Sequence, residues 1–257
     1  MLLEKPIAPT VEEGERLLRA ADAAGARILI GHHRAHSPIM AKAKEIVERG
    51  TLGTLVAVMG SAVFFKPDHY FADGPWRREP GGGPILINMI HEVHNLRILC
   101  GEIVAVQAFA SDATRGFPVE DTVAINLRFA SGALGSFMLS DTAACARELG
   151  THVAGEQGVS DLRRRGLLRR DGHVRLAVDT DDAAQDVRPR RRPLVVEAVP
   201  DERRGNDARR SAQASNGALR RGGPRRSLAA RERATALANL RVTEAIGEAA
   251  KPDRSTI

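Results

Sequence analysis

Residues 76–101 read WRREPGGGPILINMIHEVHNLRILCG, and the rest of the sequence is interpreted outward from them. Three consecutive glycines permit a sharp turn or a close approach of the backbone to a ligand, and the proline that follows is well placed to open a helix. In that helix Asn88 and His91 lie three residues apart, and His91 and Asn95 four, so their side chains can share one face. The stretch therefore predicts an imidazole and two amides beside a glycine-lined opening.

The first fifty residues predict a strand, a helix and a second strand, which is typical of a parallel α/β sheet. Thr10 and Glu13 form a capping box at the start of the first helix, and Ser37 with a following proline starts another. The expected elements are a strand ending at residue 3, a helix at 11–24, a strand at 26–30 and a helix from 38 to Gly50. Because the first strand begins with the chain, we expect further sequence upstream.

From residue 55 onward the pattern changes to long β-rich segments. The predicted strands are 55–65, 103–111, 122–129 and 133–140, with Ser131-Gly132 as a hairpin turn before the last. The helix that carries His91 falls between the first two strands. This order predicts an α+β arrangement in which helices cover one face of a mostly antiparallel sheet.

Three motifs in the same order resemble the Gfo/Idh/MocA family of NAD(P)-dependent sugar and polyol dehydrogenases. They are Glu4-Lys5-Pro6, the segment from Gly31 to Gly53, and the glycine run with His91. The resemblance covers roughly the first 145 residues. It implies that residues 1–53 are the remnant of a Rossmann dinucleotide-binding domain and that 54–160 form a substrate and oligomerisation domain. It also implies a homo-oligomer, because the outer sheet face of the family packs against a second subunit.

The second half of the chain differs in composition. No Phe, Trp or Tyr occurs after Phe137, and arginines are frequent from residue 163 onward. A segment this charged buries too little apolar area to offset the entropy of ordering it, so residues 161–230 are predicted to stay open or loosely helical. Residues 231–257 include a segment resembling the family's final helix. Resemblance that is lost and then regained indicates a frameshifted or divergent stretch.

His91 and Lys5 are the candidate catalytic residues. An imidazole titrates near neutral pH and can pass a proton either way, and an ammonium group stabilises a developing alkoxide. The resemblance makes Lys5 the family lysine that contacts substrate and nicotinamide. The alternatives are that His91 is only a buried structural residue and that Lys5 is a surface side chain. In many family members an aspartate stands where this chain has Ile87, which leaves His91 as the acid/base by default.

Other polar residues are candidates for binding. Asn88, Trp76 and Arg77 are expected to hold the substrate, because amides, an aromatic face and charged donors suit a polyhydroxylated ligand. The resemblance assigns cofactor contacts to Glu4, Lys5, Pro6 and Arg34, with NAD or NADP as the cofactor. Trp76 could equally anchor its loop, and Arg34 could be solvated. The histidines lack a cysteine or carboxylate at ligand spacing, so no metal site is expected.

The dinucleotide-binding motif GxGxxG does not occur in the sequence, and the family places it before the EKP motif. We therefore expect an NAD(P)-dependent oxidoreductase acting on CH–OH groups of a sugar or polyol, incomplete in this chain. The alternative is a non-catalytic remnant or an oligomerising binding module.

Composition limits the compartment and the partners. Two cysteines and the lack of a membrane-spanning segment favour the cytoplasm, without membrane association. The net charge of +6 rests on clustered arginines without interleaved aromatics, so no specific nucleic acid is expected.

Overall fold

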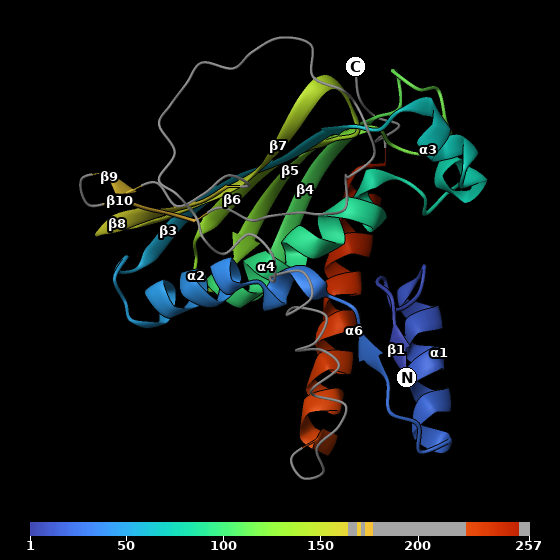
Figure 1. The fold of residues 1–257 in the computed structure, drawn as a ribbon, viewed down its shortest axis with the longest axis horizontal. Coiled ribbons are helices and arrows are strands. Elements are labelled where there is room, and N and C mark those ends of the chain that lie inside the picture. The colour runs from blue at the N-terminus through green and yellow to red at the C-terminus, as the bar shows by residue number, and fades with distance from the viewer. Residues whose placement is uncertain (164–168, 171–172, 177–224, 252–257) are drawn as a thin grey trace, which may run out of the picture.

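The computed structural model describes residues 1–163, 169–170, 173–176 and 225–251 (Figure 1). A small parallel pair opens the chain: β1 (Leu2–Leu3) lies beside β2 (Leu29–Ile30), with α1 (Val11–Ala23) between them in sequence. The Thr10 hydroxyl accepts a hydrogen bond from the Glu13 amide at 3.3 Å, which confirms the predicted start of α1. The second strand is shorter than predicted, because β1 offers only two residues for it to pair with.

A short 3₁₀ turn, η1 (His33–His36), leads into α2 (Pro38–Glu48). The Ser37 hydroxyl accepts a hydrogen bond from the Met40 amide at 3.3 Å, and Pro38 occupies the first turn, where its missing N–H costs nothing. The predicted second helix is thus confirmed.

One eight-stranded sheet dominates the molecule, in the order β4-β5-β6-β3-β7-β8-β10-β9. Only the β3–β6 and β8–β10 pairs are parallel, so the expectation of a mostly antiparallel sheet is confirmed. Its strands are β3 (Leu55–Phe65), β4 (Ile103–Ser111), β5 (Thr122–Phe129), β6 (Leu134–Ser140), β7 (Thr142–Gly155), β8 (Gly158–Arg163), β9 (Arg169–Arg170) and β10 (His173–Leu176). The predicted hairpin turn holds, with Gly132 at a φ of 92°.

Helices cover one face of this sheet, as predicted (Figure 1). Between β3 and β4 the chain forms α3 (Asp68–Ala72), the 3₁₀ turn η2 (Pro75–Arg78), the π-helical turn η3 (Ile85–Met89) and α4 (Ile90–Cys100). Buried side chains of α4, such as Val93 and Leu96, pack with strand residues such as Val123 and Leu139 in the main core. The helix that carries His91 is therefore held against the sheet by burial of its apolar side.

The last helix, α6 (Arg225–Ala249), joins the two parts of the molecule. Its Ile246 belongs to the main core, while its Ala236 and Leu240 are buried with Ile7 and Ile30 in a second core beneath α1. Figure 1 shows α6 in red, running from the sheet side down past β1, β2 and α1. Among the described residues, no helix combines the length and apolarity that crossing a membrane would require.

Most of the arginine-rich stretch, including 177–224, lies outside the described residues, as do 252–257. Where the stretch is described, residues 161–163 complete β8, and β9 and β10 extend the sheet, so these residues form strands rather than an open or loosely helical chain. The helix α6 begins at Arg225, within the part predicted to be open or loosely helical. Strand pairing here uses the backbone groups of β7 and β8, and backbone pairing does not depend on the aromatic residues whose lack motivated the prediction.

Candidate functional site

His91 occupies the second position of α4, and its side chain is only 2% exposed. Neither Nδ1 nor Nε2 has a hydrogen-bond partner among the described residues. The ring of His33 from η1 meets it edge-on, with 5.1 Å between the ring centroids. Because buried polar groups are normally hydrogen-bonded, an imidazole with two unsatisfied nitrogens is a candidate for binding a group that the described chain does not supply.

Burial lowers the pKa of His91 well below its ordinary value of 6.5, and the positive charges of Arg34 and Lys5 lower it further. Desolvation penalises the charged imidazolium, and nearby cations do the same. His91 is therefore neutral at neutral pH, which is the form that can accept a proton from a substrate hydroxyl.

Lys5 is brought to the same place from the other end of the sequence. Its Nζ donates a hydrogen bond to the carbonyl oxygen of Ile87 at 2.6 Å. Ile87 lies in η3, four positions before His91, so the contact ties the EKP segment to the start of the helix that carries the imidazole. The two side chains predicted to be catalytic thus lie in one neighbourhood, close enough for the ammonium charge to influence the imidazole.

The glycine run does not line an opening, contrary to the prediction. A Cβ on Gly82 would lie 2.3 Å from the carbonyl oxygen of Trp76, and one on Gly83 would lie 2.3 Å from Oε1 of Glu120. These glycines instead permit close packing against the protein's own chain. Glu120 Oε1 also accepts a hydrogen bond from the Ile85 amide at 2.9 Å, which satisfies a donor at the start of the helical segment.

Arg34 and Glu92 form a buried ion pair beside His91. Arg34 Nη1 lies 2.8 Å from Glu92 Oε1, and the two side chains are 5% and 4% exposed. The pair joins η1 to α4 next to His91. Sequence reasoning missed Glu92, because its partner is far away in sequence and no local spacing marks it. The cofactor role of Arg34 stays a prediction, and its Nη1 is engaged by Glu92 in this structure.

The predicted substrate residues are dispersed around the helix. Asn88 is buried at 7% exposure in η3, and Trp76 on η2 is 53% exposed. Arg77 donates a hydrogen bond to the carbonyl oxygen of Tyr70 and stacks over its ring at 3.9 Å, so it packs on α3. Glu4 is exposed and Pro6 half-buried. Within the described ranges, no group of three or more His, Cys, Asp or Glu side chains could hold a metal ion.

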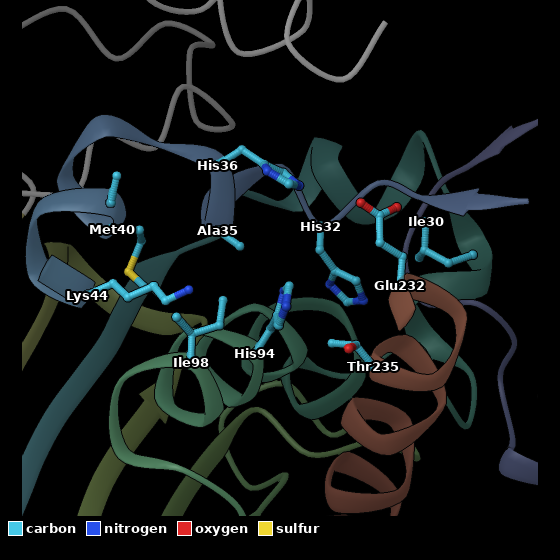
Figure 2. A pocket seen from close by; sticks show the side chains of 11 residues that line it. Ile30, His32, Ala35, His36, Met40, Lys44, His94, Ile98, Glu232 and Thr235 are labelled. Carbon is cyan, nitrogen blue, oxygen red and sulfur yellow. The ribbon is translucent and has the colours of Figure 1, made fainter. Parts of the chain in front are cut away.

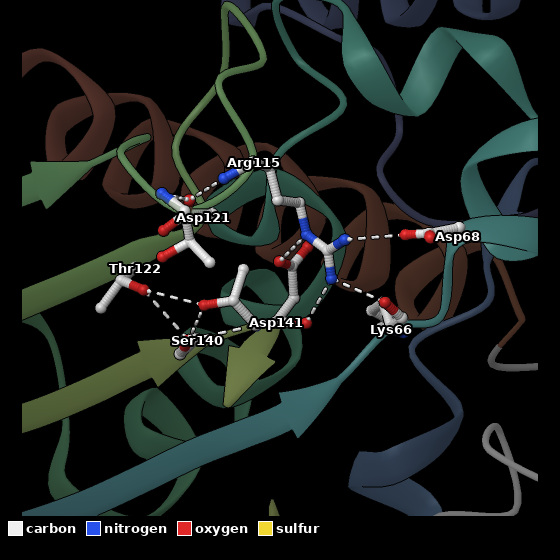
Figure 3. Close-up of polar contacts among 9 residues, drawn as sticks. Lys66, Asp68, Arg115, Asp121, Thr122, Ser140 and Asp141 are labelled. Carbon is white, nitrogen blue, oxygen red and sulfur yellow. Dashed lines mark hydrogen bonds and ion pairs between the residues drawn. The ribbon is translucent and has the colours of Figure 1, made fainter. Parts of the chain in front are cut away.

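A polar network fixes the loop that carries Glu120 (Figure 3). Arg115 Nε donates to Asp141 Oδ1 at 3.0 Å, and its Nη2 donates to the carbonyl oxygens of Lys66 and Asp141 at 2.6 and 2.8 Å. Asp121 Oδ2 accepts hydrogen bonds from the amides of Thr114 and Arg115 at 2.9 and 3.0 Å. The ends of β3, β5 and β6 are thereby tied together, and Glu120 is positioned beneath the helical segment with His91.

The arrangement of a helix that carries a histidine and packs on a mostly antiparallel sheet can be compared with known proteins. The model of the "GFO/IDH/MocA C-terminal domain" family matches residues 40–160. Residues 40–160 are thus similar to a GFO/IDH/MocA C-terminal domain. The resemblance seen in the sequence is confirmed, and the matched residues include α4 and the sheet as far as the start of β8.

Three known proteins similar to this chain illustrate the likeness. The 1,5-anhydro-D-fructose reductase of Ensifer adhaerens is 30% identical over 162 residues, which are 62% of this chain and 48% of that protein. The WlbA dehydrogenase from Bordetella pertussis, solved with NADH and UDP-GlcNAcA, is 28% identical, with a TM-score of 0.59 over 62% of this chain and 50% of that one. An oxidoreductase from Thermotoga maritima shares the fold over 97% of this chain and 68% of its own, with 21% identity and a TM-score of 0.72. This chain thus spans about half the length of the reductase.

Proposed function

We propose that this chain provides the substrate side of an NAD(P)-dependent oxidoreductase that acts on a CH–OH group of a sugar or polyol. One observation carries the proposal: His91 is buried and neutral, its two ring nitrogens have no hydrogen-bond partner among the described residues, and the charge of Lys5 acts on it. The relatives support the substrate class, since one reduces an anhydro sugar and another was solved with NADH and a nucleotide sugar.

In the oxidising direction, a neutral His91 accepts the proton of the substrate hydroxyl. The Lys5 ammonium group stabilises the negative charge that develops on the oxygen, and in the reducing direction the proton returns from the imidazolium. A nicotinamide, when bound, supplies or accepts the hydride. Of the predicted cofactor residues, Lys5 would contact the nicotinamide; its hydrogen bond to the Ile87 carbonyl, close to His91, supports this assignment. The sequence has no glycine-rich phosphate loop, so no step is assigned to the pyrophosphate.

Asn88 would hold a further substrate hydroxyl; its burial one helical turn before His91 supports this role, and an amide can both donate and accept hydrogen bonds. Trp76 and Arg77 lie on η2, beside the glycine run, and would contact the part of the substrate that extends beyond the reacting carbon.

Steady-state kinetics test the proposal. The chain is assayed by nicotinamide absorbance with NAD or NADP against 1,5-anhydro-D-fructose, aldoses and polyols. His91→Asn keeps a polar side chain but cannot pass a proton, so kcat should fall on the order of 100-fold while KM changes little. His69→Asn, at an exposed position on α3, is the matched control and should leave both constants unchanged. If His91→Asn raised KM and left kcat unchanged, His91 would not be the residue that transfers the proton.

An oligomerising binding module without dehydrogenase activity is the second candidate, and it rests on the uncovered face of the sheet. Large apolar side chains on alternate positions of β3, β4 and β6 point away from the helices. They are Met59, Phe65, Phe109, Leu134 and Met138, all 45–80% exposed. Apolar area of this kind marks interaction sites, so we propose that a second copy of the chain covers it.

The two candidates are separated by measuring mass and turnover together. Light scattering should report an oligomer, and Phe109→Glu should dissociate it, because Phe109 is 80% exposed in the described chain and a charge would be buried on association. Leu2→Glu, at an exposed position on β1 outside the large sheet, serves as the control for added charge. An oligomer that turns over none of the substrates would favour the binding module, and a wild-type monomer would contradict the association.

A further inference from the structure

A cavity of about 420 Å³ lies between η1, α2, α4 and α6 (Figure 2). Its volume is within the range of about 300–1,000 Å³ that is usual for small-molecule sites. Its polar lining comprises His32, His36, Lys44, His94, Glu232 and Thr235. His91 and Lys5 are not among its described lining residues, so this cavity adjoins the proposed catalytic neighbourhood through His32 but does not contain the catalytic pair.

Most of the polar lining can donate hydrogen bonds. His32 is only 4% exposed, and its Nδ1 has no partner among the described residues. Its Nε2 lies 3.5 Å from the Asn239 amide nitrogen on α6, and its ring meets the ring of His94 edge-on at 4.6 Å. The Nδ1 atom of His32 is thus held in place beside the cavity, where it can form a hydrogen bond with a ligand.

The cavity also has a positive side. Figure 2 shows Lys44 extending from α2 toward Ile98 and His94, with His36 on η1 above. Burial is the main cause that lowers the pKa of His32 to about 3 and that of His94 to about 4. Both imidazoles are therefore neutral at neutral pH, and the Lys44 ammonium group is the cationic donor that an anion in the cavity would meet.

The opposite side suits hydroxyl groups. Glu232 and Thr235 enter from α6, and burial raises the pKa of Glu232. A carboxyl group and a threonine hydroxyl both accept hydrogen bonds from sugar-type hydroxyls. Between the two sides, Met40 and Ile98 provide an apolar wall against which a small carbon skeleton can rest.

We propose that this cavity binds a small hydroxylated carboxylate of the sugar-acid class. Lys44 and His36 take the carboxylate, and His32, His94, Thr235 and Glu232 take the hydroxyls. The site lies beyond the proposed oxidoreductase function and does not depend on it, because neither its lining nor its ligand involves His91.

Titration of the histidine signals tests the proposal. The chain has only eight histidines, so their ring Cε1–H resonances can be followed individually by NMR. D-Glucuronate is the probe, and D-glucose is the matched neutral compound, with CH₂OH in place of the carboxylate. Glucuronate should shift the His94 and His36 signals saturably, and glucose should not. No shift with glucuronate, or an equal shift with glucose, would overturn the proposal.

A pair of variants on α2 locates the binding. Lys44→Glu reverses the charge in the cavity and should weaken glucuronate binding roughly tenfold or more, since a hydrogen bond to a charged group is lost and a repulsion gained. Lys42→Glu changes the same residue type two positions away, outside the lining, and should leave the affinity within about twofold. The two lysine side chains are 52% and 50% exposed, and each pairs with a glutamate of α2, so both variants should fold. Equal weakening by the two would show binding by general charge and would also overturn the site.

Discussion

Replacing His94 with asparagine should make the protein less sensitive to acid. Burial, helped by the charges of Arg97 and His36, lowers the pKa of His94 to about 4. In the unfolded chain the same imidazole titrates near 6.5. Below that pH the unfolded state binds a proton that the folded state refuses, so the stability present above about 6.5 is lost as the pH falls toward 4.

The magnitude follows from these two pKa values. Between pH 7 and pH 5, His94 alone should remove about 2 kcal/mol from the free energy of unfolding. Asparagine has no titrating group, so His94→Asn should lose about 2 kcal/mol less than the wild type over this interval. Burial raises the pKa values of Glu120, Asp141 and Glu232, which favours the folded state as the pH falls. These groups are present in both proteins, so the comparison cancels them.

Urea unfolding at pH 7 and pH 5, followed by circular dichroism, measures the difference. His69→Asn removes a histidine from an exposed position and should leave the wild-type loss unchanged. If His94→Asn lost as much stability as the wild type between the two pH values, His94 would not be held neutral by burial. The electrostatic account of the histidine cluster would then fail.

Two further changes probe how the helix with His91 is held. Arg34→Met should cost about 3–5 kcal/mol of stability, because Glu92 is left buried and unpaired. The double variant Arg34→Met with Glu92→Leu should recover most of this loss. Chemical denaturation measures both, and equal losses in the single and double variants would contradict a paired charge. Glu120→Ala should cost about 1–3 kcal/mol of stability, because the Ile85 amide loses its acceptor. Glu120→Gln keeps an acceptor and should cost less. Equal losses of stability in these two variants, measured by the same denaturation, would contradict the role of Glu120.

Much of the secondary structure could be predicted from local signals. The capping residues Thr10 and Ser37 set the starts of α1 and α2, and the β-rich segments at 55–65, 103–111 and 122–129 predicted strand ends that the structure reproduces. Such signals act over a few residues, so the sequence shows them directly. The same locality limited the reading of the glycine run, since only the folded chain shows Glu120 lying against Gly83.

By itself the sequence indicated the family that residues 40–160 resemble, the helix that carries His91 and the choice of His91 and Lys5 as the candidate pair. Only the tertiary structure decided that Lys5 reaches the Ile87 carbonyl, that Arg34 is paired with Glu92, and that β3 lies between β6 and β7. It alone placed α6 across two cores and left a histidine-lined cavity beside it. The physical reason is distance along the chain. Capping and periodicity depend on neighbouring residues, whereas a buried charge pair, a strand order and a cavity depend on which distant segments exclude water together.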